Sequence, residues 1–261
     1  MQGYRAKKSL GQNFLTSKTV VKKIIAAGDV SAHDTVLEIG PGKGALTGEL
    51  LATGARVIAI EKDRDLIPVL QEKFAQEVRD GRLVLLEDDV LLFDPKKAGL
   101  SEHHYKLVAN IPYYITGEIM RRFLSETLQP SLMVVLVQKE VAERVAAKDG
   151  KESILSLSVK LYGEPRLALR VPRKFFSPSP NVDSAVLTIK NIGRRNLSQK
   201  NEERFFKIVK QGFSQKRKQV VPLLSKILDK DAVLDVLAKN NLTPNVRAED
   251  IALPVWITLA Q

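Results

Sequence analysis

The chain has 261 residues, of which 44% are hydrophobic and 27% are charged, so it is long enough to bury a substantial core. It contains no cysteine, which excludes disulfides and thiolate metal sites and fits the reducing cytoplasm, where we expect the protein to lie. No apolar run reaches the roughly 18 residues that a membrane span needs, so we expect no membrane partner.

The formal net charge of +11 indicates a polyanionic partner, with nucleic acid favoured over an anionic membrane surface. Residues 1–28 contain six Lys or Arg and no Asp or Glu. Further basic stretches are RVPRKFF (170–176) and QKRK (215–218), whereas acidic residues concentrate around 61–94. A basic chain with a local acidic zone is a more specific pattern than uniform basicity.

Short apolar runs alternate with amphipathic segments, which predicts βαβ units and a mainly parallel sheet covered on both faces. The predicted strands are 35–40, 56–61, 82–89, 105–110 and 132–140. Helices are predicted from about residue 45, over 63–78, over 115–126 and after residue 140. A mainly parallel sheet of this kind predicts an α/β fold class.

The alternation of strands and helices stops after Gly163. There, two predicted strands (166–172 and 182–190) are separated by only nine residues. That connection is too short for a parallel crossover, so we expect these strands to pair antiparallel. The polar stretch 191–201 resembles a linker, and helical periodicity follows it to the end of the chain. We therefore expect a domain over 1–195 with a basic N-terminal arm, and a helical domain over 196–261.

Polar groups end four consecutive predicted strands, and ligands bind beyond the carboxyl ends of strands in an open α/β sheet. These groups are Glu38 with Gly40, Glu61, Asp88 with Asp89, and Asn110. The turn EIGPGKG (38–44) follows the pattern G-x-G-x-G and not the G-x-G-x-x-G of dinucleotide sites. A carboxylate at Glu38 would repel a pyrophosphate and attract the ammonium group of an amino acid.

The remaining strand ends suit the other parts of a nucleoside ligand. Glycine at positions 40 and 42 lets the backbone turn tightly and lets a ligand approach closely. Glu61 can accept both hydroxyls of a ribose, and Asp89 can accept a hydrogen bond from an adenine amine. Ribose, adenine and an amino-acid head without a pyrophosphate together describe S-adenosylmethionine. The competing interpretation is that Glu61 and Asp89 only cap helices.

The stretch NIPYY (110–114) joins the fourth of these strands to a helix. The Asn110 side-chain oxygen and the carbonyl before Pro112 can both accept from one exocyclic amine, and Tyr113 can stack on the ring. Two such acceptors favour a pyramidal nitrogen whose lone pair faces a sulfonium methyl, so catalysis would rest on positioning and electrostatics. The competing interpretation is a plain turn with an Asn cap and a Pro at the helix start.

Five stretches occur in the order found in the rRNA adenine N6-dimethyltransferases, namely GQNFL (11–15), EIGPGKGALT (38–47), DD (88–89), NIPYY (110–114) and FFSPSPNVDSA (175–185). The segment GFSQKRKQV (212–220) resembles the small-subunit branch of that family, the KsgA/RsmA enzymes. The resemblance implies a class I S-adenosylmethionine-dependent methyltransferase fold. That fold has a Rossmann-like, mainly parallel sheet with an antiparallel final strand, and a small C-terminal helical domain follows.

The resemblance also implies roles for individual residues. S-adenosylmethionine would contact Asn13, Leu15, Gly40, Glu61, Asp89 and Asn110, and the glycine turn adds Glu38 and Gly42. The N-terminal arm would cover the cofactor. The adenine amine would meet Asn110 and the Pro112 bend, with the ring held between Tyr113 and Phe176. Tyr114 and QKRK depart from the usual family forms, which have asparagine after the first tyrosine and a double arginine.

Similar enzymes add two methyls to each of two adjacent adenines near the 3′ end of small-subunit (16S) rRNA. We therefore expect this rRNA or the pre-30S particle as partner, a monomer, and no metal. The basic residues expected to contact RNA are Arg121, Arg122, Arg173, Lys174 and, on a C-terminal helix, Lys216, Arg217 and Lys218.

Two further expectations concern residues without a proposed functional role and the alternative functions. We expect all three histidines at the surface and Trp256 in the core of the helical domain. The rivals are an Erm-type 23S rRNA adenine N6-methyltransferase, a non-catalytic ribosome assembly factor and a DNA adenine methyltransferase.

Overall fold

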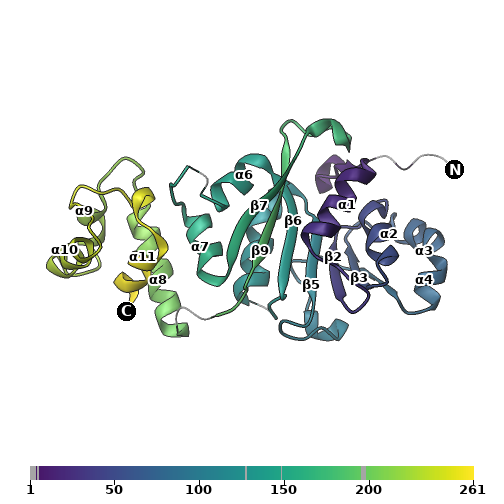
Figure 1. Ribbon diagram of the computed structural model, residues 1–261, viewed down its shortest axis with the longest axis horizontal. Coiled ribbons are helices and arrows are strands. Elements are labelled where there is room, and N and C mark those ends of the chain that lie inside the picture. Colours follow the sequence, from purple (N-terminus) through teal and green to yellow (C-terminus); the bar gives the residue numbers. More distant parts are fainter. Residues whose placement is uncertain (1–3, 5, 127, 148, 195–197) are drawn as a thin grey trace. The chain divides into compact units, whose positions relative to one another are not determined.

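The computed structural model describes residue 4 and residues 6–126, 128–147, 149–194 and 198–261 (Figure 1). The chain divides into two compact units, the first comprising Met1–Ala142 and Glu164–Ile192, the second Glu143–Gly163 and Gly193–Gln261. The boundary predicted between 195 and 196 lies outside the described residues and stays a prediction. The sequence pattern did not indicate that the internal segment 143–163 belongs with the second unit.

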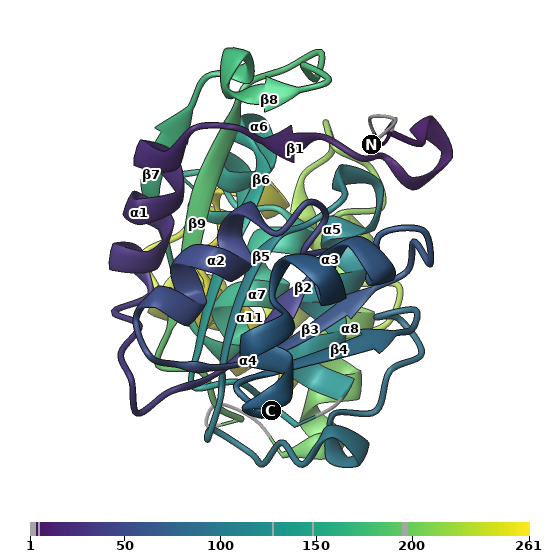
Figure 2. The same ribbon diagram turned by 90° about the vertical axis from the view of Figure 1, so that its right-hand side faces the viewer.

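In the described part of the chain, seven strands form one sheet in the order β4-β3-β2-β5-β6-β9-β7 (Figure 1). These strands are β2 (Thr35–Ile39), β3 (Arg56–Glu61), β4 (Leu83–Glu87), β5 (Lys106–Asn110), β6 (Leu132–Gln138), β7 (Glu164–Val171) and β9 (Ser184–Lys190). The pairs among β2 to β6 are parallel, while β9 runs antiparallel to both of its neighbours, which confirms the predicted antiparallel pairing. A separate sheet pairs β1 (Phe14–Leu15) with β8 (Phe176–Ser177) (Figure 2).

Both faces of the large sheet are buried. Successive side chains of a strand point to opposite faces, so neighbouring residues show the burial of each face. On one face, Val36, Val57 and Val108 join a core cluster with residues of the helices α1 (Lys18–Ala27), α2 (Ala45–Ala52) and α3 (Ile67–Lys73). Their alternate neighbours, such as Leu37 and Leu107, are fully buried on the other side of the sheet. This two-sided burial explains why the strands are continuous apolar runs in the sequence.

The helices of the first unit lie mostly where the sequence predicts them. They are α1 (Lys18–Ala27), α2 (Ala45–Ala52), α3 (Ile67–Lys73), α4 (Ala75–Arg79) and α5 (Thr116–Arg121), and α6 (Lys139–Val145) follows β6. Shorter helical turns are Lys8–Leu10, Pro95–Ala98, Tyr113–Ile115 and Arg173–Phe175, with a π-helical turn at Arg122–Glu126. None of the helices in the described residues is long and apolar enough to cross a membrane.

The single helix predicted over 63–78 is wrong in one respect, because the structure divides it at Phe74. That residue leaves the helical region with φ −117° and ψ 34°. Its ring packs against Gly44, where an added Cβ would come within 2.5 Å of the ring. The break therefore seats an aromatic ring over the glycine turn, a tertiary contact that helical periodicity does not show.

The second unit contains the helices α7 (Ile154–Tyr162), α8 (Gln199–Gly212), α9 (Val220–Leu224), α10 (Lys230–Lys239) and α11 (Leu253–Ala260), with a 3₁₀ turn at Ala248–Asp250. Trp256 is fully buried and donates through Nε1 to the carbonyl of Ile251 at 3.0 Å, which confirms its predicted core position. The prediction that the basic residues 216–218 lie on a helix is wrong. They form the exposed turn between α8 and α9.

We expect Gly212→Ala to destabilise the second unit, because the added Cβ would lie 2.4 Å from the Trp256 ring. Overpacking of this kind costs about 1–3 kcal/mol. The chain has one tryptophan, so urea unfolding followed by Trp256 fluorescence reports on this contact. Gly117→Ala is the control, since nothing lies within 4 Å of its added Cβ in helix α5. An unchanged unfolding midpoint for Gly212→Ala would contradict the packing described.

Candidate active site

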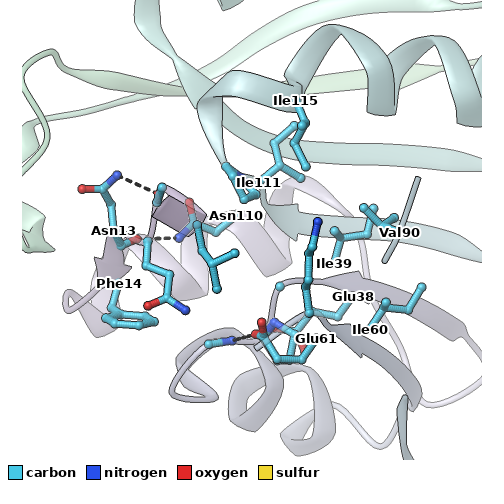
Figure 3. Close-up of a pocket in the computed structure, with 18 of the residues that line it drawn as sticks. Asn13, Phe14, Glu38, Ile39, Ile60, Glu61, Val90, Asn110, Ile111 and Ile115 are labelled. Carbon is cyan, nitrogen blue, oxygen red and sulfur yellow. Dashed lines mark hydrogen bonds between the residues drawn. The ribbon is translucent and has the colours of Figure 1, made fainter. Parts of the chain in front are cut away.

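A pocket lies at the carboxyl ends of β2, β3, β4 and β5, where the strand order reverses beside β2 (Figure 3). The lining residues are 10–15, 38–43, 45, 46, 60–62, 88–91 and 110–115. The structure therefore brings together all four polar strand ends that the sequence singled out. It also adds a fifth wall from the N-terminal arm, which we define as residue 4 and residues 6–16.

The glycine turn after β2 brings bare backbone to the pocket. Gly40 and Gly42 have φ of 67° and 58°, in the left-handed region that residues with a side chain rarely adopt. A Cβ on Gly42 would lie 2.9 Å from the ring of Phe14 in the arm, so the turn and the arm approach closely only because position 42 has no side chain.

Glu38 is a buried carboxylate at the base of this pocket and is 1% exposed. Neither of its oxygens has a hydrogen-bond partner among the described residues. Burial raises the pKa of Glu38 to about 8; the neighbouring Thr47 acts in the opposite direction, and the carboxylate of Glu61 adds to the rise. An unpartnered buried carboxylate is costly by itself, so its surroundings favour a ligand that supplies a positive charge and hydrogen-bond donors.

Glu61 ends β3 and is held firmly by backbone groups (Figure 3). Its Oε2 accepts from the Gly42 N–H at 3.0 Å, and its Oε1 accepts from the Asp63 N–H at 2.9 Å. Burial raises its pKa, although these two hydrogen bonds work in the opposite direction. Each carboxylate oxygen has a further lone pair, so the carboxylate is oriented and can still accept from a diol.

Asp89 follows β4 and is paired with Lys62 at 2.8 Å, while its Oδ1 accepts from the Leu91 N–H at 3.0 Å. Burial opposes ionisation, but Lys62, the Leu91 N–H and the charge of Arg122 together outweigh it and lower the pKa of Asp89. Asp89 is therefore an ionised acceptor at the pocket wall, as an adenine amine requires.

Asn110, at the end of β5, has a defined amide orientation because of the arm. Its Nδ2 donates to the main-chain carbonyl of Asn13 at 3.0 Å (Figure 3). A carbonyl oxygen only accepts, so the group that faces Asn13 is the NH₂ and the Asn110 Oδ1 is left as an acceptor. This orientation is the one that recognition of an exocyclic amine requires.

Tyr113 is held in place by a contact with the start of strand β9. Its hydroxyl forms a 2.6 Å hydrogen bond with the Oγ of Ser184, a fully buried residue at the start of β9. Burial raises the pKa of Tyr113, so its phenol is neutral at physiological pH. Its neighbour Tyr114 also lines the pocket and is 60% exposed, with its ring about 3.1 Å from where a Cβ on Gly11 would lie.

Phe176 does not line the pocket in this structure. It is 5% exposed, pairs with Leu15 across the β1–β8 sheet and belongs to the main core cluster. Its neighbour Phe175 is partly buried and accepts through its carbonyl from the Thr16 N–H at 2.8 Å. The sandwich of adenine between Tyr113 and Phe176 stays a prediction, whereas Asn13 and Leu15 lie at the pocket as expected.

Most residues predicted to contact RNA are exposed, namely Arg121, Arg173, Lys174, Lys216, Arg217 and Lys218. Arg122 is partly buried and donates to the carbonyl of Phe93. All three histidines are exposed, as predicted. Among the residues described, no group of three or more His, Asp or Glu side chains could hold a metal ion.

Sequence reasoning missed two sets of residues around the pocket. Tyr4, Lys7 and Gln12 of the arm converge on Asp63, and Ser184 anchors Tyr113. The only available signal was the position of Asp63 two residues after Glu61. Contacts between residues more than 50 positions apart leave no periodic pattern in one sequence.

The fold and the pocket define a class I methyltransferase. The mainly parallel sheet with one antiparallel strand is the fold of that class, and the residues fit S-adenosylmethionine. Glu38 offers an unpartnered buried carboxylate, the glycine turn a bare backbone, and Glu61 an oriented acceptor. The enzyme is accordingly S-adenosylmethionine-dependent.

The chain belongs to the ribosomal RNA adenine dimethylase family, whose sequence model matches residues 3–261. A small-subunit ribosomal RNA methyltransferase A from Dehalococcoides mccartyi is 42% identical over 260 residues, which cover 98% of this chain and 88% of that protein. A protein of the same name from Fusobacterium nucleatum is 39% identical, with 98% and 97% of the two chains covered.

Solved structures agree with this assignment. A dimethyladenosine transferase from Plasmodium falciparum superposes with a TM-score of 0.77 at 26% identity, covering 94% of this chain and 95% of that one. The 23S rRNA methyltransferase ErmE superposes with a TM-score of 0.80 at 24% identity, covering 95% and 98%. The likeness to ErmE shows the shared fold alone.

We expect the stability of the cofactor-free protein to fall with rising pH because of Glu38. Its pKa is raised from 4.5 to about 8, so folding favours the protonated form, and ionisation destabilises the fold increasingly from pH 4.5 towards 8. Glu38→Gln removes this ionisation. The melting temperature of the variant minus that of the wild type should therefore be larger at pH 8 than at pH 5. Equal differences at both pH values would show that folding does not raise the pKa of Glu38.

Proposed function

We propose that this protein dimethylates the N6 amines of two adjacent adenines near the 3′ end of 16S rRNA during small-subunit biogenesis. The observation that carries the proposal is the Asn110 amide, which the Asn13 carbonyl turns so that its oxygen is available to a target amine beside the cofactor pocket. Relatives at 36–42% identity over almost the whole chain, named small-subunit ribosomal RNA methyltransferase A, support the choice of substrate.

Each wall of the pocket binds a different part of the cofactor. The carboxylate of Glu38 would pair with the ammonium of the methionine moiety, which gives its buried charge a partner. Glu61 would accept the ribose hydroxyls, and Asp89 would accept from the adenine amine of the cofactor. The backbone of the Gly40 turn and the arm residues Asn13 and Leu15 close around it. S-adenosylmethionine, when bound, supplies an electrophilic methyl group on a positively charged sulfur.

The NIPYY corner acts on the target adenine. The Asn110 Oδ1 and the carbonyl before Pro112 would accept the two hydrogens of the amine and direct its lone pair towards the pocket. Tyr113, held by Ser184, would stack on the ring, with Phe176 on the other side. The neutral amide of Asn110 and the neutral phenol of Tyr113 are poor bases, so these residues accelerate transfer by orientation.

The partners follow from charge. The exposed basic residues at 121, 173–174 and 216–218 would bind phosphates of the rRNA or of the pre-30S particle, in both units of the chain. We also propose that the enzyme acts as a monomer in the cytoplasm and needs no metal.

The rivals differ in measurable ways. An Erm-type enzyme would methylate protein-free large-subunit rRNA, and a non-catalytic assembly factor would not bind S-adenosylmethionine. Titration calorimetry with the cofactor, followed by mass spectrometry of small-subunit particles and of free 23S rRNA, separates the three possibilities. Dimethylation of the particles alone supports the proposal.

We expect Asn110→Ala to lower methyl transfer by about a hundredfold or more, because the variant loses the acceptor that orients the amine. The measurement is mass spectrometry of 16S rRNA after incubation of small-subunit particles with cofactor and enzyme. A melting temperature close to that of the wild type shows that the variant is folded. Dimethylation at the normal rate would exclude the role given to Asn110.

We expect Glu61→Gln to weaken cofactor binding by about 10- to 100-fold, because hydrogen bonds to a charged group are stronger than those to a neutral one. Glu87→Gln is a matched control. Glu87 is the register partner of Glu61 on the adjacent strand, but it is exposed and does not line the pocket. Calorimetry should show wild-type affinity for Glu87→Gln, and equal losses in both variants would contradict the role of Glu61.

A further inference from the structure

The N-terminal arm is tied to the first unit at three places along its length. Its first described residues meet Asp63, its central residues line the pocket, and its last residues pair with the segment around Phe176. Between these ties, Asn13 supplies the carbonyl that orients Asn110. The position of the arm and the orientation of the proposed catalytic amide are therefore linked.

The first tie is a cluster around one buried carboxylate, and we call Tyr4, Lys7, Gln12 and Asp63 the arm clasp. Asp63 is 2% exposed. It accepts from the Lys7 ammonium at 2.6 Å, from the Gln12 Nε2 at 2.8 Å and from the Tyr4 hydroxyl. Burial alone would raise the pKa of Asp63, but these three partners outweigh it and lower the pKa to about 2. Losing any one partner therefore leaves a buried charge less satisfied.

The arm clasp also holds its own partners in place. The Gln12 Oε1 accepts from the Lys7 N–H at 2.8 Å, and the Tyr4 hydroxyl oxygen lies 2.9 Å from it. The side-chain amide of Gln12 is thus held through both its oxygen and its nitrogen, because its Nε2 donates to Asp63. The next residue in the chain is Asn13, so one peptide unit separates the arm clasp from the carbonyl that holds Asn110.

Asp63 reaches the pocket from its other side as well. Its backbone N–H donates to the Glu61 Oε1 at 2.9 Å, and Glu61 in turn accepts from the Gly42 N–H. The same residue thus joins the proposed ribose carboxylate to the arm that covers the pocket. A shift of Asp63 would disturb both walls together.

We propose that Asp63 is a positioning residue: by holding Tyr4, Lys7 and Gln12 it fixes the arm across the pocket, and it thereby orients Asn110 and slows cofactor release. Asp63 is not itself a lining residue of the pocket, and it acts through its contacts with Gln12 and Glu61, which are. The inference rests on the proposed function for its activity readout alone. Arm accessibility and cofactor release test it independently.

The chain offers a matched control in Asp65. Its carboxylate also pairs with Lys7 at 2.6 Å, but its side chain is 56% exposed, whereas that of Asp63 is fully buried. Exposed ion pairs of this kind contribute little to stability. Removing the charge at 65 therefore changes the same lysine's surroundings without opening the arm clasp.

The first experiment compares Asp63→Asn with Asp65→Asn in the full chain. Trypsin cleavage after Lys8, followed by intact-mass spectrometry, reports whether the arm has come loose. Stopped-flow release of S-adenosylhomocysteine reports whether the pocket opens faster. We expect both rates to rise about tenfold or more in Asp63→Asn and to stay within twofold of wild type in Asp65→Asn. Equal rates in the two variants would overturn the proposal.

The second experiment measures methylation of small-subunit particles at saturating cofactor. We expect kcat to fall about tenfold in Asp63→Asn, since a loose arm no longer fixes the Asn110 amide once cofactor is bound. Gln12→Ala removes one partner of Asp63 from the arm side, so it tests the same link while the buried carboxylate stays in place. A change in cofactor KM alone, with kcat unchanged in both variants, would overturn the positioning role.

The outcomes separate this inference from the proposed function. If particles are not methylated by the wild type, the function fails while the trypsin and release measurements still decide the arm clasp. If wild-type methylation is normal and Asp63→Asn leaves all three readouts unchanged, the arm clasp is overturned and the function stands.

Discussion

The hydrogen bond from the Asn110 amide to the Asn13 carbonyl is the contact on which the rest of the site depends. It joins the end of a central strand to the N-terminal arm, two parts of the chain 97 residues apart. An asparagine alone presents either its oxygen or its nitrogen to a ligand. The main-chain carbonyl removes that ambiguity, because it accepts hydrogen bonds and never donates them. The arm is therefore part of the site and more than its cover.

The site also resolves an apparent conflict between the basic chain and its acidic pocket. The net charge of +11 and the exposed basic residues suit a polyanionic RNA. Glu38, Glu61 and Asp89 instead line one pocket, where they would suit a cofactor that carries ammonium and sulfonium charges. Each carboxylate has a different state: Glu38 is unpartnered, Glu61 is held by backbone N–H groups, and Asp89 is paired with Lys62. One protein thus presents opposite charges to its two substrates.

The sheet and its polar strand ends could be predicted from the sequence because each leaves a local signature. Buried parallel strands are continuous apolar runs, and Glu38, Glu61, Asp89 and Asn110 follow them directly. These residues meet at one edge because parallel strands end together. The family resemblance added the arm residues Asn13 and Leu15, which no local pattern would have chosen.

The features that escaped prediction depend on contacts between distant residues. Nothing near Asp63 indicates that Lys7 and Gln12 fold back onto it, or that Ser184 meets Tyr113. The helix break at Phe74 follows from packing over Gly44, and the inclusion of 143–163 in the second unit follows from tertiary contacts. The turn at 216–218 lies in a region of helical composition, where local propensity is a weak guide to where a helix ends.

The most direct test of the central claim is a crystal structure of the protein with S-adenosylhomocysteine and an adenosine nucleotide. The predicted result is an adenine amine at about 3 Å from the Asn110 Oδ1, with the Asn110 Nδ2 still on the Asn13 carbonyl. An adenine amine bound away from Asn110, or an Asn110 amide detached from Asn13 in the complex, would contradict it.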